Sequence, residues 1–266
     1  MSDLIYQKQT VNEPLYKELI WSKPENKFFA GKYLIIGGDG FEFFKSVLIY
    51  NNLLKIGAAH IQIILPTSLR KTIDFLPPEA IYLPVTPSGS FAMDALSEML
   101  DLSITADITI ISEDVGRNSE TQLMFENLLS KMTKKVCLIN QTVEFLFHYP
   151  IDNISMFNPL IIADLKYIQK LFLKNFKEVI KLSSDFMLNI NIISDISNKY
   201  NLEIITKQED KIIVFVGKSV SVTFLNKDLK NWAEVIASSA SFYLTNNPGN
   251  RYRALTSSIY EVAFND

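Results

Sequence analysis

Cysteine is almost absent from the sequence. The single residue, Cys137, rules out an internal disulfide and a cysteine-rich metal cluster, and it fits a reducing compartment. It lies within an apolar run and is typical of a small buried side chain. The two histidines, His60 and His148, are far apart and lack the spacing of metal ligands. We therefore expect structural roles for both histidines and predict no metal site.

Long hydrophobic runs and an excess of one charge are also missing. No segment reaches the roughly 18 apolar residues that a membrane span requires. The first thirty residues carry four carboxylates and no uninterrupted apolar stretch, which excludes a secretory signal. The net charge of −3 provides no basic field for nucleic acid or an anionic membrane. The prediction is a cytoplasmic protein with neither kind of partner.

Short apolar runs alternate with segments of helical periodicity along the chain. Residues 33–36 form a run of the buried-strand type, residues 42–56 have helical spacing, and Gly57 follows where a helix C-cap is expected. A second run at 60–65 completes a β–α–β unit with parallel strands. The same patterns predict strands at 81–84, 108–111, 136–139, 160–162, 203–206, 212–216 and 221–224, and helices at 92–100, 119–132, 168–187 and 192–200. Two helices separated by a turn at 246–249 are expected to close the chain.

This order of elements predicts an α/β fold with a mainly parallel sheet that is covered on both faces. The chain has 266 residues, 48% of them hydrophobic, which is enough for one sizeable core. No linker, repeat or shift in composition divides it. We therefore expect a single domain over residues 1–266, in which residues 1–30 are a polar lead-in.

In such sheets ligands bind at the loops that follow the strands. Residues 37–40, Gly-Gly-Asp-Gly, could cradle a phosphate, but they lack the spaced-glycine fingerprint and the Lys-Ser/Thr pair of a P-loop, so a tight turn is favoured. Residues 113–114, Glu-Asp, could bind a hydrated metal, although a solvated loop face is favoured. The aromatic residues Phe41, Phe43 and Phe44 are more typical of a core or an oligomer interface than of a stacking platform.

The segments of this chain, taken in order, resemble those of the C-terminal, ribokinase-like domain of the NAD(P)H-hydrate dehydratases. These repair enzymes use ADP or ATP to restore hydrated NAD(P)H. Residues 31–38 are similar to the opening strand and glycine turn of that family, and residues 53–59 to the end of its first helix. Residues 106–121 are similar to a strand, loop and helix start, and residues 248–260 to the closing helix. The resemblance covers most of the chain and implies a three-layer α/β/α fold.

The departures from the resembled family fall on the segments that carry its chemistry. Its Gly-Pro-Gly-Leu-Gly loop corresponds to residues 112–116, its Asp-Ala-Asp stretch to 139–141 and its Thr-Pro-His-Pro-Gly-Glu segment to 162–167. The lysine of its Lys-Gly-Ala-Gly loop is kept as Lys207, whereas the glycines are Gln208 and Asp210. Its Gly-Thr-Gly-Asp signature, which supplies an anion hole and the catalytic aspartate, corresponds to Asn-Trp-Ala-Glu at 231–234.

The resemblance also implies which residues would act. It assigns ADP or ATP, with Mg²⁺, as cofactors, Glu234 as the catalytic base, Lys207, Asn231 and Ala233 as nucleotide-binding residues, and Gly37, Gly38 and Gly116 as substrate-binding residues.

The replaced signature predicts impaired catalysis, because glycines let backbone N–H groups approach a phosphate without a side-chain clash. Trp232 and Ala233 place side chains in that space. Glu234 moves the carboxylate by one methylene, and a displacement of about 1 Å can cost a hundredfold in rate.

Three functions remain open on the sequence. The first is a non-catalytic relative that serves as a nucleotide-sensing or structural subunit. The second is an active dehydratase that uses Glu234, and the third is a small-molecule kinase of the wider ribokinase-like fold. The partners expected are a nucleotide and either further copies of the chain, as a homo-oligomer, or an intact relative in a mixed assembly.

Overall fold

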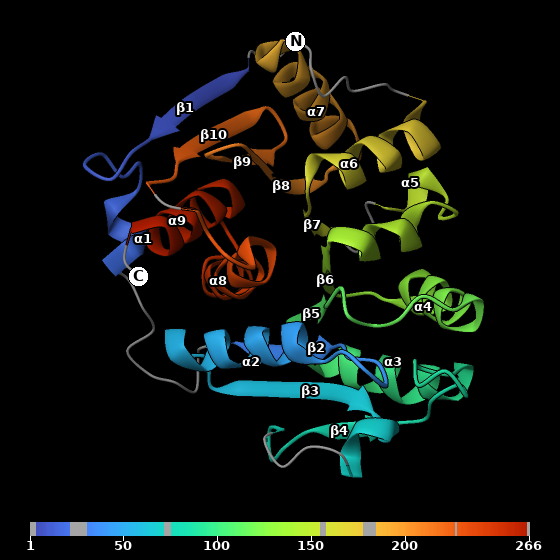
Figure 1. Ribbon diagram of the computed structural model, residues 1–266. Coiled ribbons are helices and arrows are strands. Elements are labelled where there is room, and N and C mark those ends of the chain that lie inside the picture. The colour runs from blue at the N-terminus through green and yellow to red at the C-terminus, as the bar shows by residue number, and fades with distance from the viewer. Residues whose placement is uncertain are drawn as a thin grey trace.

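The computed structural model describes residues 4–21, 31–71, 76–154, 158–177, 185–226 and 228–264. Its centre is a ten-stranded sheet with the order β1-β10-β9-β8-β7-β6-β5-β2-β3-β4 (Figure 1). The strands are β1 Ile5–Gln9, β2 Lys32–Ile36, β3 His60–Pro66, β4 Ile81–Leu83, β5 Ile108–Ile111, β6 Lys135–Ile139, β7 Leu160–Ile162, β8 Glu203–Gln208, β9 Lys211–Val216 and β10 Ser219–Phe224.

From β4 to β8 all neighbouring strands run parallel, and the hairpin β8–β9–β10 adds the antiparallel pairs. The predicted α/β class with a mainly parallel sheet is therefore confirmed. Within β2 the side chains alternate between two cores. Leu34 and Ile36 pack on one face of the sheet, and Tyr33 and Ile35 pack on the other. A strand whose two faces are both buried consists of a continuous apolar run, and for this reason the strand could be predicted from the sequence.

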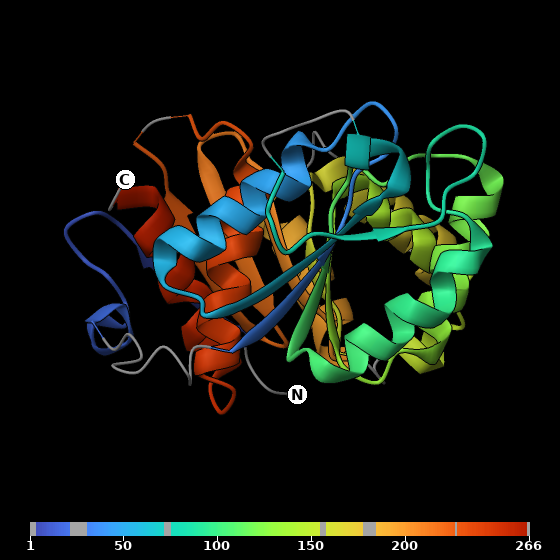
Figure 2. The same cartoon turned by 90° about the horizontal axis from the view of Figure 1, so that it is seen from below.

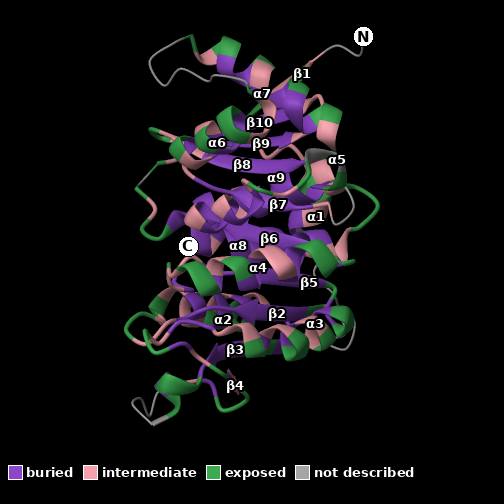
Figure 3. Cartoon of the chain, turned by 90° about the vertical axis from the view of Figure 1, so that its right-hand side faces the viewer, coloured by how far each residue is buried: buried purple, intermediate pink, exposed green. Residues whose placement is uncertain are grey.

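Helices cover both faces of the sheet, which gives three layers (Figures 1 and 2). Residues of α2, α8 and α9 join one core, and residues of α3, α4, α6 and α7 join the other. Burial is concentrated on the strands and on the inward helix surfaces (Figure 3). The helices are α1 Lys17–Trp21, α2 Phe44–Ile56, α3 Leu96–Thr105, α4 Ser119–Lys131, α5 Ile151–Ile154, α6 Leu165–Leu171, α7 Phe186–Tyr200, α8 Trp232–Asn246 and α9 Arg251–Phe264, with 3-10 helices at Thr67–Lys71, Met93–Ala95 and Asn140–Leu146.

The amino-terminal segment is more ordered than a polar lead-in. Residues 5–9 form β1, which pairs in parallel with β10 at the edge of the sheet. Gln9 is fully buried there, because its side-chain amide donates to Thr223 Oγ1 at 3.0 Å and to the Thr256 carbonyl at 3.1 Å. The sequence analysis did not predict this strand, because its buried residue, Gln9, is polar. Residues 1–3 and 22–30 of the expected lead-in lie outside the described residues.

The expected helix over 168–187 is wrong in its extent. Helix α6 ends at Leu171 and continues as one π-helical turn, Phe172–Phe176, which stops at Lys177 in the left-handed region with φ 57°. Helix α7 begins at Phe186, ahead of the expected 192, and the Asp185 carboxylate caps it by accepting the Met187 N–H at 2.8 Å. Part of the expected helix, residues 178–184, lies outside the described residues.

Candidate functional site

The carboxyl ends of the parallel strands meet at one edge of the sheet, which we call the carboxyl edge. Gly37 and Gly38 follow β2, residues 112–114 follow β5, Asn140 follows β6, and Asp164 lies just beyond β7. Helix α8 starts beside them, and its first turn carries Trp232 and Glu234. In sheets of this kind ligands bind at this edge. It is also where the sequence placed most of the candidate residues.

Asp114 is a deeply buried acidic group of this edge, with 3% of its surface exposed. Its Oδ1 accepts the Gly38 N–H at 3.0 Å, and its Oδ2 accepts the N–H groups of Lys45 and Ser46 at 3.1 and 3.0 Å. The carboxylate therefore caps the start of α2 from a distant loop, in the position that an anion takes at a helix N-terminus. Burial raises the pKa of Asp114, and the hydrogen bonds from Gly38 and Ser46 oppose that rise. The expectation of a solvated loop face at 113–114 is wrong.

The glycines at 37 and 38 make room for this cap. A Cβ at Gly37 would lie 2.5 Å from Ser46 Cβ and 2.8 Å from Asp114 Oδ1. Gly38 has φ +85°, a conformation that side chains rarely adopt. Both glycines are buried. The structure thus places the two predicted substrate-binding glycines against Asp114.

Glu234 is buried at the start of α8, with 2% of its surface exposed. Lys45 Nζ lies 3.6 Å from Glu234 Oε1 and is also paired with Glu113. Glu234 Oε1 has no hydrogen-bond partner among the described residues. Burial raises the pKa of Glu234, Lys45 lowers it, and the nearby Asp114 charge raises it further. Two carboxylates, Glu113 and Glu234, thus pair with the Lys45 ammonium group, and a third, Asp114, accepts the Lys45 backbone N–H.

Trp232 closes the space in front of α8. Its indole N–H donates to Asp164 Oδ1 at 3.2 Å, which joins the start of α8 to the loop beyond β7, and 9% of the residue is exposed. The Asp164 N–H is in turn bonded to Asn140 Oδ1 at 3.0 Å, and Asn140 has φ 47°. The indole of the predicted anion-hole segment is therefore mostly buried and is tied to the loop beyond β7.

Of the other predicted nucleotide-binding residues, Lys207 is paired and Ala233 is buried, whereas Asn231 is exposed. Lys207, near the end of β8, forms a 2.6 Å ion pair with Asp228 in the segment before α8. Asn231 is left-handed, with φ 49°, and its side chain forms no cap hydrogen bond. Ala233 is 1% exposed. A polyphosphate at the start of α8 would meet the Trp232 side chain and the buried Glu234 carboxylate, both in the first turn.

A cavity of about 290 Å³ remains open at the carboxyl edge. Its charged and polar lining comes from α4, the Asn140–Leu146 turn, α6 and the loop before α4. Tyr167 stands in this wall with the ammonium groups of Lys166 and Lys170 over its ring, at 4.9 and 5.6 Å from the centroid. The lining residues are Gly116, Arg117, Gln122, Gln141, Glu144, Phe145, Tyr167 and Lys170.

The structure brings some predicted residues together and separates others. Glu234 lies near Asp114, Gly116 lines the open cavity, and Lys207 is paired with Asp228 in the segment before α8. Sequence reasoning missed Lys45, Arg117 and Lys170. Lys45 follows the first residue of an amphipathic helix, where a lysine carries no distinctive signal.

Two smaller expectations, for Cys137 and for the aromatic residues near position 41, have outcomes. Cys137 is fully buried, as predicted, and its burial raises the thiol pKa. Phe41 and Phe44 are 86% and 64% exposed, so they are not part of the core. Within the ranges that the structure describes, no three His, Cys, Asp or Glu side chains are arranged to hold a metal ion.

The sequence matches no protein-family model and no curated protein. Solved structures share the fold. A ribokinase-like superfamily protein from Enterococcus faecalis aligns with a TM-score of 0.72 at 11% identity, over 97% of this chain and 86% of that one. The ADP/ATP-dependent NAD(P)H-hydrate dehydratase from Bacillus subtilis, co-crystallised with ATP and Mg²⁺, aligns with a TM-score of 0.67 at 13% identity, over 94% and 87%. A carbohydrate kinase from Agrobacterium tumefaciens aligns with a TM-score of 0.51 at 11% sequence identity, over 86% of this chain and 88% of that one. The chain therefore has a ribokinase-like fold. No helix in the described ranges has the length and apolarity to cross a bilayer.

Proposed function

We propose that this chain is a non-catalytic relative of the NAD(P)H-hydrate dehydratases that binds a pyridine nucleotide on the Gly116 side of the carboxyl edge without turning it over. The observation that carries the proposal is the closed start of α8. Trp232 is bonded to Asp164, and Glu234 is buried beside Lys45 and Asp114. A base enclosed in this way has no access to a substrate proton, and the buried Glu234 carboxylate in the first turn of α8 opposes an ATP phosphate there.

The open cavity supports the binding half of the proposal. Arg117 and Lys170 supply positive charge for a phosphate, and Gln122 and Gln141 supply amide groups. Tyr167 adds an aromatic surface beside them. A volume of about 290 Å³ lies at the small end of ligand sites. The cavity therefore suits a mononucleotide, or the nicotinamide half of a dinucleotide.

The catalytic half is tested with purified protein, hydrated NADH and either ADP or ATP. We expect no turnover above background at high enzyme concentration, and we expect the Glu234→Gln variant to give the same background rate. Turnover that Glu234→Gln abolishes would identify an active dehydratase with Glu234 as its base, and would refute the proposal.

The binding half is tested by thermal shift with nicotinamide mononucleotide and NAD, using ADP and ATP for comparison. A ligand at 100 times its Kd stabilises a protein by about 2.7 kcal/mol. We expect the two pyridine nucleotides to raise Tm, ADP and ATP to leave it unchanged, and Arg117→Gln to remove the response. Lys131→Gln, an exposed change at the far end of α4, is the matched control. No response to either pyridine nucleotide would sink the binding claim.

Self-association belongs to the same proposal. Phe41 and Phe44 are largely exposed beside the start of α2. Exposed aromatic residues in close sequence proximity are typical of an interaction surface. We expect a homo-oligomer in light scattering, and a monomer for Phe41→Ser/Phe44→Ser. A wild-type monomer at micromolar concentration would leave an intact relative as the partner to be tested by co-purification.

A further inference from the structure

The opposite edge of the sheet, the amino edge, holds a second group of charged residues. Lys32, Lys135 and Glu203 are the first residues of β2, β6 and β8, and Asp107 immediately precedes β5. Because these strands are parallel, their first residues lie along the same edge. Arg251, the first residue of α9, joins them. None of these residues belongs to the carboxyl-edge site.

Glu203 is the buried centre of an ion triad with two partly exposed cations. It is 1% exposed, and each of its carboxylate oxygens accepts one cation. Lys135 Nζ donates to Oε2 at 2.7 Å, and Arg251 Nη1 donates to Oε1 at 3.0 Å. Lys135 also donates to the Asn158 carbonyl at 3.0 Å, and Arg251 Nη2 donates to Asn201 Oδ1 at 3.1 Å. The triad joins β6, β8 and α9.

The triad carries more positive charge than its structural role requires. One carboxylate balances one of the two cations, so a net charge of +1 remains. The bonds described above use two of the five N–H donors of Arg251 and two of the three of Lys135. The remaining donors are open to a bound group, because 20% of the Lys135 side chain and 35% of the Arg251 side chain are exposed. Burial lowers the pKa of Lys135, which is the cost of placing this ammonium group away from bulk water.

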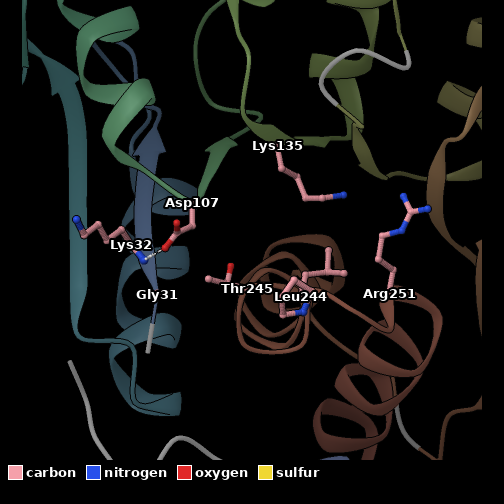
Figure 4. Close-up of a pocket in the computed structure, with 8 residues that line it drawn as sticks. Gly31, Lys32, Asp107, Lys135, Leu244, Thr245 and Arg251 are labelled. Atoms are coloured by element: carbon pink, nitrogen blue, oxygen red, sulfur yellow. Dashed lines mark hydrogen bonds between the residues drawn. The ribbon is translucent and has the colours of Figure 1, made fainter. Parts of the chain in front are cut away.

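The two cations face a cavity of about 480 Å³. In Figure 4 the Lys135 and Arg251 side chains stand on one side, and Asp107 stands on the other beside Gly31, with Leu244 and Thr245 between them. Asp107 Oδ2 accepts the Lys32 N–H at 2.9 Å, which fixes the carboxylate at the cavity wall. The described residues that line it are Gly31, Lys32, Asp107, Lys135, Leu244, Thr245, Pro248 and Arg251.

Gly31 allows α8 to approach this wall closely. It has φ +77°, and a Cβ there would lie 2.4 Å from Thr245 Cγ2. A larger residue would push the end of α8 away from β2 and disturb the cavity. The cavity is thus bounded by elements in direct contact.

The geometry points to a ligand site at the amino edge that takes a small metabolite with one anionic oxygen group, a carboxylate or a phosphate. Arg251 and Lys135 bind the anionic group, because guanidinium and ammonium donors form their strongest hydrogen bonds with ionised oxygen acceptors. Asp107 and the Thr245 hydroxyl receive a polar group at the other end. Leu244 and Pro248 contact the apolar part. The site does not depend on the function proposed for the carboxyl edge.

A purely structural triad is the competing explanation. Such a triad needs no cavity, and replacing a buried ion group by apolar residues is often neutral or stabilising. A lone Lys135–Glu203 pair would already tie β6 to β8. The structural explanation does not account for the second cation, Arg251, whose remaining N–H donors lie at the cavity wall.

The test uses the ¹⁵N-labelled full chain, titrated with inorganic phosphate and with succinate at constant ionic strength in sodium chloride. We expect saturable amide shifts at residues 31–32 and 244–251, and none at Gly38 or Gly116. The stronger of the two probes identifies the anionic group. The proposed site would be overturned by this titration alone if no amide shift saturates, or if the saturable shifts centre on the carboxyl edge.

Two arginines of α9 give a matched pair of variants. Arg251→Gln leaves a neutral Lys135–Glu203 pair, and we expect binding to weaken at least tenfold. Arg253 lies two residues further on, 49% exposed and paired with Glu18, so Arg253→Gln should bind as the wild type does. Equal affinity in both variants would overturn the proposal.

Discussion

Removing the Trp232 indole tests whether the start of α8 is closed by packing. Truncating a buried Trp to Ala costs about 3–5 kcal/mol. Because 9% of Trp232 is exposed and it lies at the edge of the core, we take about 3 kcal/mol for the lost packing. The hydrogen bond to Asp164 adds about 1 kcal/mol. Trp232→Ala should therefore lower the free energy of unfolding by about 4 kcal/mol.

Trp232→Phe separates the two contributions. Phenylalanine keeps most of the apolar contact and loses only the N–H donor. The Asp164 side chain is 40% exposed, so water can replace the indole. We expect a loss of about 1–2 kcal/mol. Urea denaturation at 25 °C measures all three proteins. A loss below about 1 kcal/mol for Trp232→Ala would refute the packing argument, and so would stabilisation of the wild type by ADP or ATP.

Three further predictions concern the carboxyl edge. Burial raises the pKa of the Glu234 carboxyl group above its ordinary 4.5. The protonated group therefore stabilises the fold at acidic pH, and this stabilisation is lost as the pH rises through the raised pKa. Glu234→Gln should flatten the decline of the unfolding free energy between about pH 4 and 8, measured by urea denaturation. Asp114→Ala should cost about 3 kcal/mol in urea denaturation, because buried N–H groups of Gly38 and Ser46 lose their acceptor, and a loss below about 1 kcal/mol would contradict the cap. Gly116→Ala should lower Tm much more than Gly57→Ala: both glycines have positive φ, but a Cβ at 116 would lie 2.0 Å from Ser90 Oγ and one at 57 meets nothing within 4 Å. Equal Tm changes for the two alanine variants would contradict that reasoning.

The fold could be predicted from the sequence where burial is apolar. Residues 33–36 and 108–111 lie inside the sheet, and both faces of each strand are buried, so each appears as an unbroken apolar run. Strand β1 could not be found in this way. Its inward residue Gln9 is buried through hydrogen bonds to Thr223 and Thr256, and a polar residue gives no hydrophobic periodicity.

The candidate site could be predicted only in part. The resemblance placed Trp232 and Glu234 at the start of a helix, and α8 begins there. The role of Asp114 depends on contacts with Gly38 and Ser46, which are 76 and 68 residues away in sequence. The role of Lys45 depends equally on the distant Glu234. No local pattern encodes such contacts, since topology alone brings the loops after β2 and β5 next to each other.

The two helix starts at the carboxyl edge share one physical consequence. Helix N-termini attract anions, and in a ligand-binding protein that attraction is available to a phosphate. Here Asp114 already accepts the amides at the start of α2, and Glu234 places a buried carboxylate in the first turn of α8. A free phosphate would have to displace a side chain that is covalently held in position, and would meet like charge while doing so. Among the neighbouring loops the Gly116 cavity still offers cationic groups, Arg117 and Lys170, to an incoming anion. A ligand that enters the carboxyl edge is therefore directed away from Glu234, which is the reason to expect binding without turnover.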